Sequence, residues 1–375
     1  MKKKHRLALA FFVFFTVSAA YAQKKFVHPG ILFNKADLER IYLTAQQPAS
    51  PGYGSYKLLS SNPLASADYK MKGPFRIISR DGEHGNTKSR MEADFSAAYL
   101  NSIMWVATHN KAHAERALTV LEAYADSLKS IPATNDAPLL VGLEGLKIVN
   151  ALEILKYSYK SGNKVQLDKI IAMVKNIFLP VAETFYRTPA YTNGNWGPIV
   201  TKFYISAAIY LNDEKMYNKA VDFYLHANDN GTIANYIDGE TGQIQESGRD
   251  QGHSQLGIGA MATVCEIAWK QGNDLYGALQ NRLLKGFEYV ASYNLGNNVP
   301  FRTWKDITGK YSDWNEISTV SRGKFIPVYQ MVYNHYVTRK GMSMPFTKQV
   351  IDQVGPEGYD RDQPGFGTFL YLGSK

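Results

Sequence analysis

Apolar side chains recur with the period of an α-helix over most of this chain, and this pattern limits the fold more than any other feature. Residues 91–110, 112–128 and 139–159 place apolar groups at i, i+3, i+4 and i+7. The alternating pattern of β-strands is scarce. Further helical segments are expected at about 164–187, 198–212, 214–228, 255–272, 277–296 and 320–338. The sequence therefore predicts an all-α protein.

Long connections alternate with short turns between the predicted helices. The long ones are rich in Gly, Asn, Asp and aromatic residues, and they span residues 63–90, 130–138, 188–197, 229–254 and 297–319. Successive antiparallel helices put alternate loops at opposite ends of a layer, so every long loop is expected at the same end. A binding site would be built there. Helical hairpins of this size, arranged in a ring, predict an α/α toroid, an incomplete barrel of about six or seven hairpins.

The first 22 residues have a basic start, an apolar run and a small-residue ending, which is the pattern of a secretory signal peptide. Cleavage is expected after Ala22. The apolar run is too short to span a bilayer, so we expect no membrane insertion. No linker divides residues 23–375, which we interpret as a single domain, exported to the periplasm or secreted and monomeric.

The composition favours a carbohydrate or an anionic polymer as the partner. Four of the 42 basic residues belong to the signal peptide, which leaves 38 against 33 acidic residues. The chain also has 25 tyrosines and an aromatic content of 13%. Because the positive charge is dispersed rather than clustered in a basic arm, nucleic acid is not expected as a partner.

Neither a metal nor a cofactor is expected. The chain has no HExxH, no CxxC, no phosphate-binding loop and no nucleophile elbow. Its single cysteine, Cys265, cannot form an internal disulfide and is expected in the core.

The stretch "ESGRDQGHSQLGIG", residues 246–259, is the first candidate site. It carries Glu246, Arg249, Asp250, Gln251 and His253 among glycines. Ser254 is expected to cap a helix that begins near Gln255, so Arg249 and His253 would face a helix N-terminus, where an anion is favoured. The alternative is structural: Arg249 pairs with Asp250, and His253 bonds to a loop carbonyl.

A second candidate is "TPAYTNGNWGP", residues 188–198. Asn193 or Asn195 would donate an amide to a carboxylate, and Trp196 offers a flat face for a sugar ring. An ordinary turn is the alternative, because Asn-Gly is a strong turn signal.

Two further loops complete the candidate set. Residues 292–314 bring Tyr293, Arg302, Trp304, Tyr311 and Trp314 to the same predicted end. Packing is the alternative role for any one tyrosine in a chain that has so many. The polar loop 80–90 contains His84 and is either a lid over the site or solvated.

Five segments together resemble one known family. They are "HPGILFNKADLERI" (28–41), "NGNWGP" (193–198), "ESGRDQGHSQLGIG" (246–259), "WKQGNDLYG" (269–277) and "NRLLKGFEYVASYNLGNNVPF" (281–301). The chain resembles the alginate lyase superfamily of bacterial polysaccharide lyases, and more narrowly polysaccharide lyase family thirty-eight. The resemblance covers nearly all of residues 23–375. It implies an α/α toroid and β-elimination on a polyuronate, in which the uronate carboxylate is neutralised, the C5 proton removed and the leaving O4 protonated.

Such lyases typically use Asn, His, Arg and Tyr, and the resemblance assigns these roles to Asn195, His253, Arg249 and a tyrosine. The better-known members carry an adjacent Asn-His pair and a Tyr seven residues after the Arg. Here Trp196 follows Asn195, and Leu256 stands seven residues after Arg249. The catalytic tyrosine must then come from elsewhere, with Tyr311 and Tyr293 as the candidates. The side chains expected to bind substrate are Asn193, Trp196, Glu246, Gln251, Arg302, Trp304 and His84.

Three functions follow as hypotheses. The first is a lyase that cleaves alginate, rich in mannuronate, or a related polyuronate. The second is a glycoside hydrolase on a similar toroid, which needs two carboxylic acids, drawn from Glu246, Asp250 and Asp313. The third is a non-catalytic polyuronate-binding protein.

Overall fold

Helices make up the regular structure of residues 25–159 and 164–375, the part of the chain that the computed structural model describes. These residues form no β-strand and only isolated bridges. The predicted signal peptide, residues 1–22, lies outside the described residues. The longer helices are α1 (Lys35–Gln46), α2 (Tyr53–Ser60), α3 (Lys88–Thr108), α4 (Lys111–Ser127), α5 (Ala137–Ser158), α6 (Lys164–Met173), α7 (Leu179–Arg187), α8 (Trp196–Leu211), α9 (Glu214–His226), α11 (Gln251–Lys270), α12 (Ala278–Asn294) and α14 (Pro345–Val354). The short elements are η1 (Pro63–Ala65), η2 (Gly82–Thr87), α10 (Ile233–Tyr236), α13 (Tyr329–Tyr333) and α15 (Gly367–Leu370), with π-helical turns η3 (Val174–Phe178) and η4 (Asn334–Arg339).

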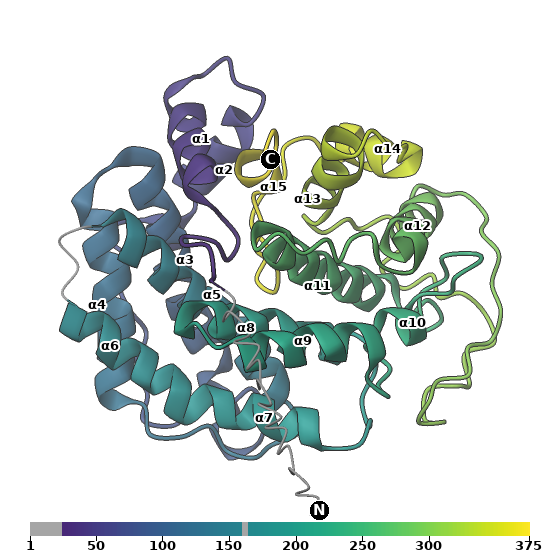
Figure 1. Ribbon diagram of the computed structural model, residues 1–375, viewed down its shortest axis with the longest axis horizontal. Helices are drawn as coiled ribbons and strands as arrows, with labels where there is room; N and C mark the ends of the chain where they lie inside the picture. Colours follow the sequence, from purple (N-terminus) through teal and green to yellow (C-terminus); the bar gives the residue numbers. More distant parts are fainter. Residues whose placement is uncertain (1–24, 160–163) are drawn as a thin grey trace, which may run out of the picture.

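The helices form an inner and an outer layer (Figure 1). In the inner layer α3 packs on α5, α5 on α8, and α8 on α11. Each inner helix is followed in the chain by an outer one: α4, the α6–α7 segment, α9 and α12. The helical pattern of the sequence thus predicted these pairs correctly.

The inner helices α5 and α8 approach closely because glycine stands at two positions of α5. A Cβ on Gly142 would lie 2.5 Å from the Ile199 carbonyl oxygen, and one on Gly145 would lie 2.4 Å from the Phe203 ring. Neither space admits a side chain. α5 is buried on every face, and its polar side chains Glu144, Lys147, Asn150 and Glu153 are buried with the apolar ones.

Two helix starts differ from the sequence prediction. α11 begins at Gln251 instead of near Gln255, because Asp250 and not Ser254 caps it. The helix expected over residues 320–338 begins only at Tyr329. Pro327 cannot donate a helical hydrogen bond, and Gly323 has a φ of 77°, so the preceding residues run as irregular chain.

A buried group of charged side chains joins α1 and the C-terminal segment to α11. Lys270 Nζ lies 2.7 Å from Asp37 Oδ2 on α1 and 3.3 Å from Glu266 Oε1. Arg339, in η4, makes two bonds of 2.8 Å to the Glu266 carboxylate. Ser374 donates its hydroxyl to Asp37 Oδ1 at 2.6 Å. The C-terminal residues therefore hold the first helix against the last ones and close the ring.

Two further observations concern single features of the described residues. Cys265 is fully buried with its Sγ 3.2 Å from the Tyr224 hydroxyl, so its predicted place in the core is confirmed. Across residues 25–159 and 164–375, every helix is too short or too polar to cross a membrane.

We predict that Glu266→Gln lowers the free energy of unfolding by about 3–5 kcal/mol, because it leaves Arg339 a buried cation without its carboxylate and leaves Lys270 with Asp37 alone. Urea denaturation measures the change. Asp352→Asn is the matched control: Asp352 pairs with Lys348 on the exposed face of α14, so its loss should leave the free energy of unfolding almost unchanged. Equal, small effects for the two variants would contradict the role given to the buried group.

Candidate active site

A cleft of about 470 Å³ lies at the end of the inner layer where α3, α5, α8 and α11 begin. All five long loops contribute residues to it, so the expectation that they share one end is confirmed. The polar and aromatic residues that line it are Arg80, Lys88, Asn135, Asp136, Tyr191, Thr192, Asn193, Asn195, Trp196, Arg249, His253, Tyr311, Arg361 and Asp362. Four apolar residues, Leu139, Leu143, Ile199 and Leu256, complete the wall.

The starts of the inner helices give the cleft a positive field. Lys88 is the first residue of α3, Asp136 and Asn195 are the N-caps of α5 and α8, and His253 lies in the first turn of α11. Each helix N-terminus is equivalent to roughly half a positive charge. Because all four meet here, the backbone alone favours an anion in the cleft.

Asp250 fixes the position of His253. Its Oδ1 accepts the His253 backbone N–H at 2.7 Å and so caps α11, while its Oδ2 lies 2.6 Å from His253 Nδ1. Burial acts to raise the pKa of Asp250, but the hydrogen bonds from the His253 side chain and backbone outweigh it and leave this pKa below its ordinary value. The carboxylate is thus ionised and orients the ring.

Arg249 fixes the tautomer of His253. Its Nη2 lies 3.1 Å from His253 Nε2. An arginine can only donate, so Nε2 must accept, and the ring proton is assigned to Nδ1, toward Asp250. His253 therefore presents an unprotonated nitrogen beside the Arg249 side chain in the cleft.

Glu246 is fully buried and binds several parts of the site at once. Its carboxylate accepts the side-chain amide of Asn195 at 2.8 Å, the Tyr236 hydroxyl at 2.9 Å and Arg249 Nη1 at 2.7 Å. It also accepts the Asn195 backbone N–H at 3.2 Å. One carboxylate therefore holds the loop before α8 and the loop before α11 together.

Tyr311 reaches the cleft on the loop between α12 and α13. Its hydroxyl donates to the Tyr191 carbonyl oxygen at 3.2 Å. Burial raises the pKa of the Tyr311 phenol, although the charge of Arg249 opposes the shift.

The carboxylate of Asp306 organises the segment that carries Tyr311. Burial acts to raise the pKa of Asp306, but hydrogen bonds from Thr308, Asn230 and the Tyr311 backbone lower it to about 2. The bond from Asn230 Nδ2, 3.0 Å long, ties this loop to the one that follows α9. Tyr311 thus rests on an ordered loop.

Three cations besides Arg249 line the cleft. Arg80 lies 2.5 Å from Glu92, which is also 3.7 Å from Arg361. Arg361 is half exposed and comes from the C-terminal segment, while Lys88 stands at the start of α3. Four cationic side chains around one cleft suit a ligand with repeated negative charges.

The structure does not bring all predicted site residues together. Asn195, Arg249, His253, Tyr311, Asn193 and Trp196 line the cleft, whereas Tyr293, Glu246, Gln251, Arg302, Trp304 and His84 do not. Tyr293 is buried, with the Arg322 guanidinium 4.0 Å from its ring centroid. The expectation that Glu246 and Gln251 contact a ligand is wrong, because both are buried and hydrogen-bonded inside the protein.

The other three lie away from the cleft. Arg302 pairs with Asp238, and its side chain is 67% exposed. Trp304 is half-buried on the same loop. His84 lies in the 3₁₀-helix η2, whose neighbours Arg80 and Lys88 line the cleft instead.

Several cleft residues carry a weak sequence signal. Arg80 and Lys88 lie in a loop whose polar character was visible, and Asn135 lies in the long loop before α5. The sequence around Arg361 and Asp362 shows only two charged residues near proline and glycine, which does not indicate a site. These residues reach the cleft only because the fold brings the C-terminal segment there. Among the residues that the structure describes, no group of three or more His, Cys, Asp or Glu side chains could hold a metal ion.

The paired helices form a ring, and a cationic cleft lies where the inner helices begin. Solved structures of other proteins have the same fold. The crystal structure of alginate lyase A1-III from Sphingomonas species A1 matches with a TM-score of 0.59 and 14% identity, over 90% of this chain and 99% of that one. A histidine-to-alanine variant of alginate lyase A1-III, complexed with a tetrasaccharide, matches with a TM-score of 0.60 and 13% identity, over 86% and 96%. An alginate lyase from Bacteroides ovatus matches with a TM-score of 0.56 and 12% identity, over 92% and 100%. These matches confirm the α/α toroid.

Residues 44–301 match the family model described as alginate lyase. The chain therefore belongs to the alginate lyase family and is a polysaccharide lyase. A comparison with curated proteins gave no match.

We predict that Glu246→Gln lowers both activity and stability, because it removes the charge on which Asn195 and Arg249 converge. Loss of a hydrogen bond to a charged group costs about 1.5–3 kcal/mol of unfolding free energy. Misplacement of site residues by about 1 Å should lower turnover about a hundredfold.

Chemical denaturation and a lyase assay on the same samples measure the two effects. Glu240→Gln, at an exposed position of the same loop, is the matched control and should change neither. Activity of Glu246→Gln within twofold of the control would contradict the positioning role.

Proposed function

We propose that this protein cleaves a polyuronate, with mannuronate-rich alginate as the first candidate, by β-elimination that leaves a 4,5-unsaturated uronate end. One observation carries the proposal: Asn195, Arg249, His253 and Tyr311 line a single cleft with a surplus of cations. The family to which the chain belongs supports the same reaction class.

The uronate carboxylate must be neutralised first, because the C5 proton is otherwise too weakly acidic to be removed. We assign this role to Arg249, which Glu246 holds in place. Asn195 is 1% exposed and gives its amide to both oxygens of Glu246, so it supports the site from behind. Donors that are fixed before the reaction stabilise the negative charge that develops on the carboxylate as C5 loses its proton. The starts of α8 and α11 add their positive field.

His253 has the arrangement of a general base. Its Nε2 is free of a proton, and Asp250 accepts from Nδ1, so the imidazolium that forms on proton transfer is stabilised by the neighbouring carboxylate. The substrate carboxylate replaces Nε2 as the acceptor of Arg249 Nη2, while Nη1 stays on Glu246. Nε2 then takes the C5 proton.

Tyr311 suits the role of general acid. Burial raises the pKa of its phenol, so the hydroxyl keeps its proton at neutral pH. In the elimination the C5–H and C4–O4 bonds break and the C4–C5 double bond forms. The phenol proton passes to O4 as the leaving group departs.

The two uronates of alginate require different proton transfers. Guluronate presents the C5 hydrogen and O4 on opposite faces of the ring, so it needs His253 on one side and Tyr311 on the other. Mannuronate presents both on one face, so a single group is enough: Tyr311, once its phenol proton has passed to water, takes the C5 proton and returns it to O4. Glucuronan shares the mannuronate geometry.

A glycoside hydrolase would need two carboxylic acids on either side of the bond. Glu246 is fully buried, and Asp313 is exposed away from the cleft. Asp250 is bound to His253. The two carboxylates that do line the cleft, Asp136 and Asp362, lie 4.0 Å from Arg80 and 3.5 Å from Arg361. The three acids expected from the sequence therefore do not form the pair that a hydrolase needs.

The proposal includes a place of action. An exported polysaccharide lyase would meet its polymer outside the cytoplasm, and the leader pattern of residues 1–22 supports a periplasmic or secreted enzyme. Fractionation of cells that express the full chain tests the location.

We expect absorbance of a 4,5-unsaturated uronate to rise when the protein is mixed with polymannuronate, and unsulfated chondroitin is assayed beside it. The panel also includes polyguluronate and polyglucuronate. New reducing ends without that absorbance would mean hydrolysis. Tight binding without either product would mean a non-catalytic binding protein.

We predict that Tyr311→Phe lowers kcat about a thousandfold on every substrate that is cleaved, as expected for loss of general acid–base help. His253→Asn should reduce guluronate cleavage far more than mannuronate cleavage. Tyr293→Phe is the matched control, since Tyr293 is buried outside the cleft, and it should keep its activity. A large loss in Tyr293→Phe and a small one in Tyr311→Phe would reverse the assignment.

A further inference from the structure

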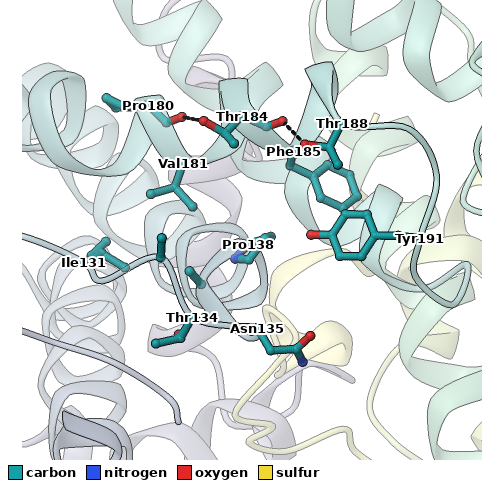
Figure 2. Close-up of a pocket in the computed structure, with 12 residues that line it drawn as sticks. Ile131, Thr134, Asn135, Pro138, Pro180, Val181, Thr184, Phe185, Thr188 and Tyr191 are labelled. Atoms are coloured by element: carbon teal, nitrogen blue, oxygen red, sulfur yellow. Dashed lines mark hydrogen bonds between the residues drawn. The ribbon is translucent and has the colours of Figure 1, made fainter. Parts of the chain in front are cut away.

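A second cavity of about 420 Å³ adjoins the cleft. The two share Asn135 and Tyr191 in their walls. Figure 2 shows Ile131 and Val181 on one side of this cavity and the rings of Phe185 and Tyr191 on the other. The second cavity is therefore a lateral extension of the space in which the uronate would be cleaved.

The residues that line the second cavity carry no charge. Its polar groups are hydroxyls and one amide, from Thr134, Thr184, Thr188, Tyr191 and Asn135. The cleft, in contrast, is lined by four cationic side chains. A carboxylate placed in the second cavity would find no cation among the lining residues, whereas one in the cleft would find four.

The hydroxyl groups are nevertheless able to bind a ligand. Thr184 Oγ1 donates to the Pro180 carbonyl oxygen at 2.9 Å, and Thr188 Oγ1 donates to that of Thr184 at 2.8 Å. Each therefore keeps its lone pairs as acceptors. In Figure 2 the Tyr191 hydroxyl points into the cavity.

The size and the remaining wall fit a small organic group. Cavities that bind such groups measure about 300–1,000 Å³ and combine apolar walls with a few placed polar groups. The rings of Phe185 and Tyr191, with centroids 6.1 Å apart, offer apolar faces beside these acceptors. Such a wall suits the C–H groups and hydroxyls of a neutral sugar, or the methyl and carbonyl of an acyl ester.

We propose that the second cavity binds an uncharged part of the polysaccharide next to the uronate that is cleaved. This inference rests on the proposed lyase function and narrows its substrate class to polyuronates that carry uncharged groups. Two sources share this chemistry: a neutral sugar that alternates with the uronate, or an acyl ester on a neighbouring uronate.

The test compares matched pairs of polymers. Unsulfated chondroitin against polyglucuronate tests a neutral sugar, and polymannuronate after and before chemical O-acetylation tests an ester. Formation of unsaturated product gives kcat/KM for each. In at least one pair, we expect a higher kcat/KM for the polymer that carries uncharged groups. A preference for chondroitin would identify a neutral sugar as the bound group, and a preference for acetylated polymannuronate would identify an ester.

Val181→Lys places a cation in the second cavity, and Val165→Lys places one at an exposed position of α6 outside it as the control. We expect Val181→Lys to shift the preference toward the all-uronate polymer by about threefold or more, the size of a partly exposed ion pair. Val165→Lys should leave the preference unchanged.

Binding of tetrasaccharides from the same polymers is measured by calorimetry in Tyr311→Phe, so that this result does not depend on turnover. The second cavity does not bind uncharged groups if the two tetrasaccharides of each pair bind with equal affinity. The same holds if Val181→Lys leaves the preference unaltered, even where cleavage is observed. A preference in binding that Val181→Lys abolishes supports the inference even if no polymer is cleaved, an outcome that would overturn only the proposed function.

Discussion

The site depends on one buried negative charge. Glu246 has no contact with solvent, and a buried carboxylate is tolerated only where donors surround it. The donors are Asn195, Tyr236 and Arg249, which come from three different segments. Their geometry is thus set by the need to satisfy Glu246 before any ligand arrives. Arg249, held by Glu246, in turn donates to His253 Nε2, and Asp250 binds the other ring nitrogen.

The toroid places these groups where the backbone itself is positive. Because inner and outer helices alternate, the inner helices α3, α5, α8 and α11 all begin at the same end. Their N-termini converge on the cleft and favour anions independently of any side chain. Loop residues can therefore change during evolution while the cleft keeps its preference for negative charge.

Sequence reasoning predicted the fold better than the site. Helical periodicity located most of the longer helices, and the lengths of the connections indicated the end at which the cleft lies. The stretch around Arg249 and His253 was found because its residue types are unusual for a loop. Glu246 was misassigned, since the sequence gives no sign of whether a carboxylate faces a cleft or the interior. Arg361 was missed because only the closed ring brings it to the cleft.

The sequence also could not decide between Tyr293 and Tyr311, because it does not show which side chain faces the cleft. Both stand near the predicted end of the layer, one in the last turn of a helix and the other on the loop that follows. A helix turn rotates a side chain by a fixed angle, so a small error in the predicted helix face decides between burial and exposure. Tyr293 faces the interior, while Tyr311 is held by a loop that Asp306 orders.

Closure of the ring by Ser374 and Asp37 has a consequence for how this chain folds. The two residues are separated by 337 positions, and loop-closure entropy rises with the length of chain between contacting groups. The helical hairpins need only local contacts and can form early, whereas the joining of the first helix to the last residues must wait until all of them are in place. Until then the faces of α1 and α11 that the C-terminal segment covers are open to water, with Asp37, Glu266 and Lys270 hydrated. We therefore expect these charges to lose their water late in folding, as the ends of the ring meet.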